Sequence, residues 1–191
     1  MTRADGLSAT AIVIVEGVSD RVAVKRLAER RGRDLGAEGV SVLAIGGAQA
    51  IGKVLRLIRP QEREVRLAGL CDAGEECNFR RALERARLGE NLTRESMEEL
   101  GFYVCDADLE DELIRSLGPD AVERILDQQG DLRSFRTFQQ QPAWHGRTTQ
   151  EQLRRFLGTT SGRKAGYARL LVDALDPERA PRPLDGVLAH V

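Results

Sequence analysis

Four short apolar runs along the chain have the pattern of strands that are buried on both faces. They cover Ala11–Val15, Val40–Ile45, Val65–Cys71 and Phe102–Cys105, and each is continuously apolar or nearly so. Strands of a parallel sheet are covered by helices on both sides, so they lack the apolar–polar alternation of half-exposed strands. The four runs therefore predict a mainly parallel sheet.

The segments between these runs have the pattern of helices. We predict helices over about 19–31, 48–59 and 93–101. Ser19 or Asp20 can cap the first, the second has apolar residues along one helical face, and Thr93 opens the third. Strands that alternate with helices in this way predict a Rossmann-like α/β fold, with a mainly parallel sheet flanked by helices and right-handed crossovers.

No further strand is predicted after Glu110. Helices are predicted over 109–117, 119–129, 148–157 and 161–175, joined by a polar, aromatic-dotted connection over 135–147 and followed by an irregular tail over 177–186. Thr148 and Glu151 have the spacing of a capping box. We therefore expect an α/β core over residues 1–117 and a helical C-terminal extension over 118–191, packed together as a single compact unit.

The length and the cysteine content limit the classes of protein to which the chain can belong. A chain of 191 residues is long enough for one well-buried domain with an appendage. It contains no apolar run of ~20 residues and no pattern of a signal peptide, so we expect a cytoplasmic protein without a membrane partner. Cys71, Cys77 and Cys105 have no zinc-site spacing, and we expect them to be buried thiols.

The charge is distributed unevenly along the chain. Residues 131–170 carry eight basic and two acidic side chains, a net charge of +6, whereas the remainder has a net charge of −7. Such asymmetry favours a polyanionic partner, although a merely solvated basic face explains it as well.

Three of the four apolar runs end in carboxylates. Glu16 follows the first, with Asp20 one turn later; Asp72 follows the third; Asp108 and Glu110 follow the fourth. The carboxyl ends of parallel strands meet at one edge of a sheet, where ligands bind. Crowded carboxylates repel one another, and clustered oxygen ligands suit Mg²⁺ or Mn²⁺. The sequence therefore predicts a metal site at this edge.

The motifs "VEGVSD" after the first strand and "DLEDELI" after the fourth resemble a Toprim domain, the metal-binding module of topoisomerases, primases, recombination factors and certain nucleases. The likeness covers roughly residues 10–175 and is strongest to the Toprim module of OLD-family nucleases. It implies a Toprim-like fold, and it implies functional acids at Glu16, Asp20, Asp72, Asp108 and Glu110. The lysine that is functional in that family is best matched by Lys164.

The resemblance implies a stand-alone, metal-dependent nuclease that uses two Mg²⁺ or Mn²⁺ ions to cleave nucleic acid, with DNA as the expected substrate. In this reading Glu16 and Lys164 are catalytic, and Arg154, Arg155 and Arg163 bind the nucleic-acid backbone. Many OLD-family proteins have an ATPase domain before the Toprim module, and we expect that this chain has no room for one. A separate ATPase chain is therefore a candidate partner. Formation of a homo-oligomer stays open.

Other readings of the same residues remain open. Toprim domains often have a second acid two residues after the one matched by Asp72, where this chain has Gly74, and Glu75 or Glu76 is the candidate replacement. That departure favours a non-catalytic module that binds nucleic acid or a partner protein. Another nucleotidyl-transfer or phosphohydrolase role is a third reading.

Individual residues also have structural readings. Asp20 can be a helix cap, the acids of 108–112 can be an acidic helix start, and Lys164 can be a solvated cation. The segment "GAQAIGKV" at 47–54 nearly fits a phosphate-binding loop, but Val54 replaces the required hydroxyl. A glycine turn that leaves Lys53 facing a phosphate backbone is the preferred reading of that segment.

Overall fold

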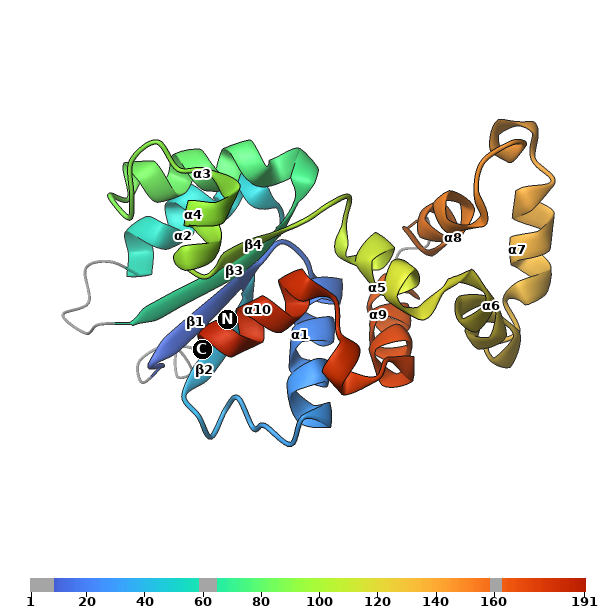
Figure 1. Cartoon of the computed structure of the whole chain (residues 1–191), viewed down its shortest axis with the longest axis horizontal. Helices are drawn as coiled ribbons and strands as arrows, with labels where there is room; N and C mark the ends of the chain where they lie inside the picture. Colours follow the sequence, from blue (N-terminus) through green and yellow to red (C-terminus); the bar gives the residue numbers. More distant parts are fainter. Residues whose placement is uncertain (1–8, 59–64, 159–162) are drawn as a thin grey trace.

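A computed structural model describes residues 9–58, 65–158 and 163–191 (Figure 1). In this part of the chain, four parallel strands form a sheet in the order β2-β1-β3-β4. The strands are β1 (Ala11–Val15), β2 (Val40–Ala44), β3 (Arg66–Asp72) and β4 (Phe102–Cys105). The mainly parallel sheet flanked by helices is therefore confirmed.

One face of the sheet is covered by three helices, drawn above it in Figure 1. They are α2 (Ile51–Ile58), α3 (Glu76–Arg85) and α4 (Arg94–Glu99), and the short 3₁₀ turns η1 (Ala48–Ala50) and η2 (Ala73–Glu75) precede α2 and α3. Ile14 of β1 and Phe102 of β4 are buried against Leu55 and Phe79 of these helices. These residues belong to the apolar layer between the sheet and the three helices.

The opposite face is covered by helices from both ends of the chain. α1 (Val18–Arg30) and α10 (Arg182–His190) lie beneath the sheet, and α9 (Arg163–Ala174) packs along α1 (Figure 1). Arg26 of α1 pairs with Asp173, and Arg30 donates hydrogen bonds to the carbonyls of Val172 and Leu175 at 2.6 and 2.5 Å. These contacts join the C-terminal ends of α1 and α9.

Four helices between β4 and α9 carry the chain away from the sheet, toward the right of Figure 1. They are α5 (Leu109–Leu117), α6 (Pro119–Gln128), α7 (Leu132–Gln139) and α8 (Thr149–Gly158), with the turn η3 (Pro142–Trp144) before α8. The rings of Phe135, Phe138, Phe156 and Trp144 pack together between α7 and α8. The predicted capping box is present, because Thr148 and Glu151 hydrogen-bond each other's backbone N–H.

The structure corrects the sequence analysis in three segments. Helix α3 was not expected, α7 begins in the segment 135–147 that was expected to be a connection, and the supposedly irregular tail contains the turn η4 (Pro177–Arg179) and helix α10. The tail has prolines at 177, 181 and 183, but Pro183 lies in the first turn of α10, where a missing N–H costs nothing. Gly186 allows α10 to pack closely against β4, because a side chain there would collide with the Tyr103 ring.

The thiols differ in exposure. Cys71 and Cys105 are buried, and burial raises the pKa of both thiols. Cys77 is exposed on α3, so the expectation that all three are buried is wrong for this residue.

In the described residues, no helix is both long and apolar enough to cross a membrane.

The contacts between helices bear on the predicted division of the chain into a core and an extension. Helices α9 and α10 return to the layer beneath the sheet, and α10 contacts β3 and β4. Helices α6, α7 and α8 contact mainly one another and their neighbours α5 and α9. The division into a core over 1–117 and an extension over 118–191 stays a prediction.

Candidate metal centre

Three neighbouring strands bring the predicted acids to one edge of the sheet. Strands β1, β3 and β4 are adjacent and parallel, so their carboxyl ends lie side by side. Glu16 directly follows β1, Asp72 is the last residue of β3, and Asp108 precedes α5, whose first turn contains Glu110. The topology of the sheet, rather than any local motif, therefore assembles the cluster.

Glu16 is held by backbone groups of two other segments. Its carboxylate accepts a hydrogen bond from the backbone N–H of Asp72 at 2.9 Å, and its own carbonyl accepts from the N–H groups of Gly46 and Gly47. Burial raises the pKa of Glu16; the Asp72 N–H opposes this rise, and the charge of Asp20 adds to it. Glu16 is thus a partly buried carboxylate with a fixed orientation.

Asp72 interacts with all the other acids of the cluster. Burial, and then the charges of Glu16, Asp20, Asp108 and Glu110, raise the pKa of Asp72 to about 7. Among the described residues, none donates a hydrogen bond to its carboxylate. A group that repels four neighbours and has no donor is one that a bound cation would stabilise strongly.

Asp20 has a structural role as well as a place in the cluster. It is the third residue of α1, and its carboxylate accepts a hydrogen bond from the backbone N–H of Gly17 at 2.7 Å. Gly17 is the N-cap of α1, so the expectation that Ser19 or Asp20 caps this helix is wrong; Asp20, at N3, instead accepts the hydrogen bond from the N-cap backbone. Asp20 still contributes to the raised pKa values of Glu16, Asp72 and Glu110.

Asp108 divides its two carboxylate oxygens between a helix cap and an arginine. Oδ1 accepts a hydrogen bond from the backbone N–H of Asp111 at 2.8 Å, which makes Asp108 the N-cap of α5. Oδ2 accepts from Nε of Arg154 at 2.6 Å. Arg154, expected in a nucleic-acid interface, therefore lies at the border of the acidic cluster.

Glu110 and Lys164 form the most deeply placed ion pair of the cluster. Nζ of Lys164, in the first turn of α9, lies 3.2 Å from Oε2 of Glu110, whose side chain is only 5% exposed. Burial raises the pKa of Glu110, and Lys164 opposes that rise. The second oxygen, Oε1, is buried and has no hydrogen-bond partner in the described residues.

The donor set fits a divalent cation chemically. The five side chains offer only carboxylate oxygens, which hard cations such as Mg²⁺ and Mn²⁺ prefer, and Oε1 of Glu110 is a buried acceptor without a donor. In their present rotamers, no three acidic, histidine or cysteine side chains of the described residues are close enough to hold one ion. To hold one ion together, some of these acids would have to change rotamer, and Asp108 would have to share its oxygen with Arg154.

The two candidate replacements for the acid absent at Gly74 behave differently. Glu76 pairs with Arg94 at 2.8 Å. Glu75 accepts a hydrogen bond from Asn78, and its charge adds to the raised pKa of Glu16. Glu75 is therefore the acid near Gly74 whose charge reaches the cluster.

Glu112 has a role that the sequence analysis missed. It is 4% exposed, accepts a hydrogen bond from the backbone N–H of Asp106 at 3.0 Å and pairs with Arg115. These contacts hold the turn between β4 and α5, and so position Asp108. The sequence gives no signal that Glu112, within a strongly acidic stretch, is buried together with Glu110.

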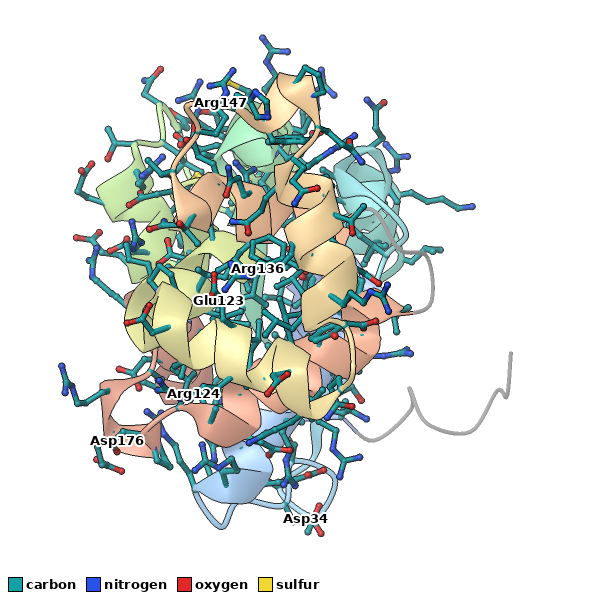
Figure 2. The ribbon with its side chains drawn as sticks, turned by 90° about the vertical axis from the view of Figure 1, so that its right-hand side faces the viewer. Asp34, Glu123, Arg124, Arg136, Arg147 and Asp176 are labelled. Atoms are coloured by element: carbon teal, nitrogen blue, oxygen red, sulfur yellow. The ribbon has the colours of Figure 1, made fainter. Side chains whose placement is uncertain are left out.

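Most of the basic residues of segment 131–170 already have acidic partners. Arg136 pairs with Glu123, as Figure 2 shows, and the other pairs are Arg147–Glu151, Arg154–Asp108, Lys164–Glu110 and Arg169–Asp173. Within the part of the chain that the structure describes, Arg133 and Arg155 make no ion pair, and the side chain of Arg163 lies outside the described residues. The segment is therefore less basic in the folded protein than its sequence suggests.

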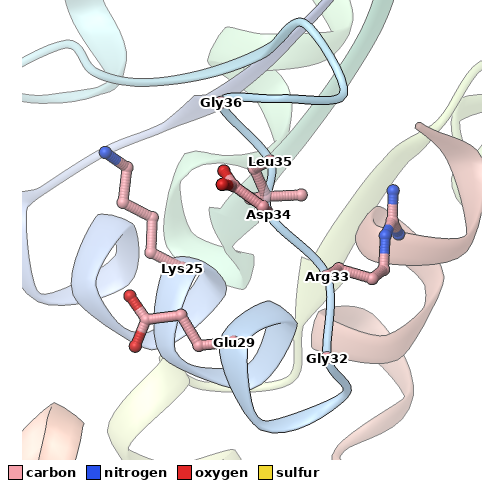
Figure 3. Close-up of a pocket in the computed structure, with 7 residues that line it drawn as sticks. All are labelled: Lys25, Glu29, Gly32, Arg33, Asp34, Leu35 and Gly36. Carbon is pink, nitrogen blue, oxygen red and sulfur yellow. The ribbon is translucent and has the colours of Figure 1, made fainter.

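A separate hollow of about 470 Å³ lies at the other end of α1 (Figure 3). Lys25 and Glu29 of α1 line it, together with the loop from Gly32 to Gly36. Figure 3 shows the Lys25 ammonium and the carboxylates of Glu29 and Asp34 around the same space. Charges of both signs line this hollow, which lies at the opposite end of α1 from the acidic cluster.

Comparison with known proteins agrees with this geometry. Residues 7–73 match the family model described as "Overcoming lysogenization defect protein-like, TOPRIM domain". The C-terminal region of the Burkholderia pseudomallei OLD protein superposes with a TM-score of 0.73 at 19% identity, covering 95% of this chain and 96% of that one. The chain has the fold of an OLD Toprim region.

A second solved structure gives the same result. The C-terminal region of the Xanthomonas campestris pv. campestris OLD protein superposes with a TM-score of 0.70 at 19% identity, covering 96% of this chain and 95% of that one. No curated protein sequence matches the chain. The resemblance to the OLD-like Toprim domain is thus confirmed, and its fold extends over nearly the whole chain, helices α6 to α10 included.

Proposed function

We propose that this OLD-like Toprim chain is a metal-dependent nuclease that hydrolyses phosphodiester bonds of nucleic acid, with DNA as the expected substrate. The observation that carries the proposal is the convergence of five carboxylates from three adjacent strand ends, with Lys164 Nζ 3.2 Å from Glu110. A fold has no structural need to crowd four other acids around one half-buried aspartate, and such a cluster is typical of a functional site.

The five acids would hold two Mg²⁺ or Mn²⁺ ions. Such ions would neutralise phosphate charge and activate water for an in-line displacement. The unpartnered oxygen of Glu110 and the donor-free carboxylate of Asp72 are the ligands whose present surroundings stabilise them least.

Glu16 and Lys164 have different roles in this proposal. The Asp72 N–H fixes the direction of the Glu16 carboxylate, so that it can hold a metal and orient the attacking water. Lys164 stays protonated: burial lowers its pKa, but the charge and hydrogen bond of Glu110, together with the charges of Asp20 and Asp108, more than offset this and raise it. Its ammonium can therefore stabilise the charge that develops on the phosphate.

Nucleic acid would be held by Arg154, Arg155 and Arg163. Contacts to phosphates release counterions, so affinity falls steeply as salt rises. A separate ATPase chain, a homo-oligomeric state and a cytoplasmic location stay predictions.

The test of the proposal is cleavage by the purified chain. Supercoiled plasmid and oligonucleotides are incubated with Mg²⁺, Mn²⁺, Ca²⁺ or chelator, and we expect nicking with Mg²⁺ or Mn²⁺ that the chelator abolishes. The activity has to co-purify with the chain, which excludes a contaminating nuclease. Nucleic acid that stays intact under every cation would contradict the proposal.

A non-catalytic binding module is the second candidate, and two observations favour it. Gly74 stands where many Toprim domains have a second acid, and no three acids of the described residues lie within reach of one ion in their present rotamers. This reading expects binding of nucleic acid without metal-dependent cleavage, and binding that Glu16→Gln leaves unchanged. The cleavage assay therefore separates the two candidates.

A further inference from the structure

A hollow of about 370 Å³ adjoins the acidic cluster on the side of α8. Trp144, Arg147, Glu151, Arg154 and Arg155 line it, and Asp108 forms its boundary with the cluster. We call this hollow the arginine pocket. Because Asp108 belongs both to the pocket and to the cluster, a ligand in the pocket lies directly beside the proposed reaction centre.

The three guanidinium groups of the arginine pocket are available to an anion to different degrees. Arg155 makes no ion pair with any described residue. The pair of Arg147 with Glu151 spans 3.5 Å between two side chains that are 60% and 49% exposed, so it holds Arg147 only weakly. Arg154 is tied to Asp108 at 2.6 Å. Guanidinium groups in this arrangement suit a phosphate, which they bind in a bidentate manner.

Trp144 gives the pocket a flat apolar wall. Its ring stacks on Phe138 with a centroid distance of 4.9 Å and an interplanar angle of 30°, which fixes the orientation of the indole. An aromatic wall next to arginines is the combination on which single-stranded nucleic acid binds, with the base stacked and the phosphate paired. A volume of about 370 Å³ is near the lower end of the range for small-ligand sites, and it suits one nucleotide rather than a base pair.

We propose that the arginine pocket binds one unpaired nucleotide of the substrate strand, next to the phosphate that is cleaved. This inference rests on the proposed function and specifies its substrate class: a strand that is single-stranded, or frayed, at the reaction site. Arg155 holds the phosphate of that nucleotide, Trp144 stacks on its base, and Arg154 lies between this nucleotide and the acids.

The only tryptophan of the chain reports directly on the pocket, because Trp144 is that residue. Its fluorescence is measured in the presence of chelator while three probes are added: a short single-stranded oligothymidylate, a blunt duplex of the same length, and thymidine monophosphate. We expect the single strand to quench the fluorescence at lower concentration than either of the others. Equal quenching by the duplex, or by the mononucleotide, would overturn the proposal.

Arg155→Gln provides the residue-specific test, and Arg133→Gln is its matched control. Both arginines are exposed members of segment 131–170 without an ion pair in the described residues, but Arg133 lies on α7, outside the pocket. A lost charge-assisted contact costs ~1.5 kcal/mol or more, so Arg155→Gln should weaken single-strand binding roughly tenfold. Arg133→Gln should weaken it far less, and equal effects of the two substitutions would contradict the pocket.

Failure of this proposal differs from failure of the proposed function. A chain that cleaves plasmid with Mn²⁺ but shows no Arg155-dependent quenching is a nuclease without this subsite. A chain that shows the quenching but never cleaves has the subsite without the activity. The fluorescence assay contains no metal, so its result does not depend on cleavage.

Discussion

The strand-end acids and the basic residues of the helices differ in what holds them in place. Glu16, Asp20 and Asp108 accept hydrogen bonds from backbone N–H groups of neighbouring turns and helix starts. Arg154 and Lys164 are held by acids of the cluster itself. Backbone groups therefore fix these three acids independently of any ligand. Arg154 and Lys164, by contrast, are bound to carboxylates that a metal would also bind, and a phosphate would compete with those carboxylates for the two side chains.

This difference suggests a division of labour within the proposed site. Backbone donors do not leave when a ligand arrives, so they preserve the orientation of the carboxylates. An arginine paired with a partly exposed carboxylate exchanges partners at little cost, because such pairs contribute ~0–1 kcal/mol. The predictions below compare the two kinds of contact, from the largest expected effect to the smallest.

Glu16→Gln should give the largest effect, on catalysis. The amide keeps the shape of the side chain and can still accept the hydrogen bond from Asp72, but it loses the charge that holds a metal and orients water. We expect metal-dependent plasmid nicking to fall at least about a hundredfold. Binding of single-stranded DNA should stay near the wild-type value in the same preparation. Undiminished nicking would show that Glu16 only ends a strand.

Asp72→Asn should stabilise the fold, and more so at higher pH. The raised pKa of Asp72 means that this group favours the folded state below pH ~4, and that its contribution is lost as pH rises toward about 7. Asparagine does not titrate, so the melting temperature of the variant should exceed that of the wild type by more at about pH 8 than at about pH 4. Each kcal/mol corresponds to a shift of ~2–4 °C.

The measurement is differential scanning calorimetry with chelator present throughout. Glu123→Gln is a suitable control, because Glu123 lies on α6 and pairs with Arg136 outside the cluster. The melting temperature of Glu123→Gln should not rise relative to that of the wild type at high pH. A difference between Asp72→Asn and wild type that stays constant with pH would contradict the proposed crowding around Asp72.

Substitutions at Asp108 should separate the helix cap from the ion pair. Asparagine caps a helix as well as aspartate does, so Asp108→Asn removes the charge opposite Arg154 and keeps the hydrogen bond from Asp111. Asp108→Ala removes both. We expect the alanine variant to be less stable than the asparagine variant by about 1 kcal/mol in urea denaturation. If Asp108→Asn loses as much stability as Asp108→Ala, the ion pair with Arg154 contributes more than a partly exposed pair should.

The sequence predicts the acids better than it predicts the bases. A buried strand followed by Glu16 or Asp72 is a local pattern, and the parallel order of the strands then places both at one edge. The partners of Arg154 and Lys164 are far away in the sequence, and nothing local indicates that Arg154 meets Asp108. The net charge of segment 131–170 was therefore a poor measure of its free positive charge.

The missed helices have related physical causes. Helix α3 buries only a narrow stripe containing Phe79 and Leu83 within a strongly charged segment, so its apolar pattern is weak. In α7, Phe135 is buried by packing against α8, which the sequence alone does not reveal. In α10, closely spaced prolines suggested an irregular tail, whereas Pro183 falls in the first turn, where proline is tolerated.

The central claim is that the five strand-end acids form one metal site, and the effect of Mn²⁺ on the melting temperature tests it most directly. A cation that binds only the folded chain raises its melting temperature, and the rise grows with the cation concentration. We expect such a rise for the wild type and none for the double variant Asp72→Asn, Glu110→Gln, which lacks the two least-stabilised carboxylates and should still fold. If the double variant responds to Mn²⁺ as the wild type does, the metal site is not at this edge of the sheet.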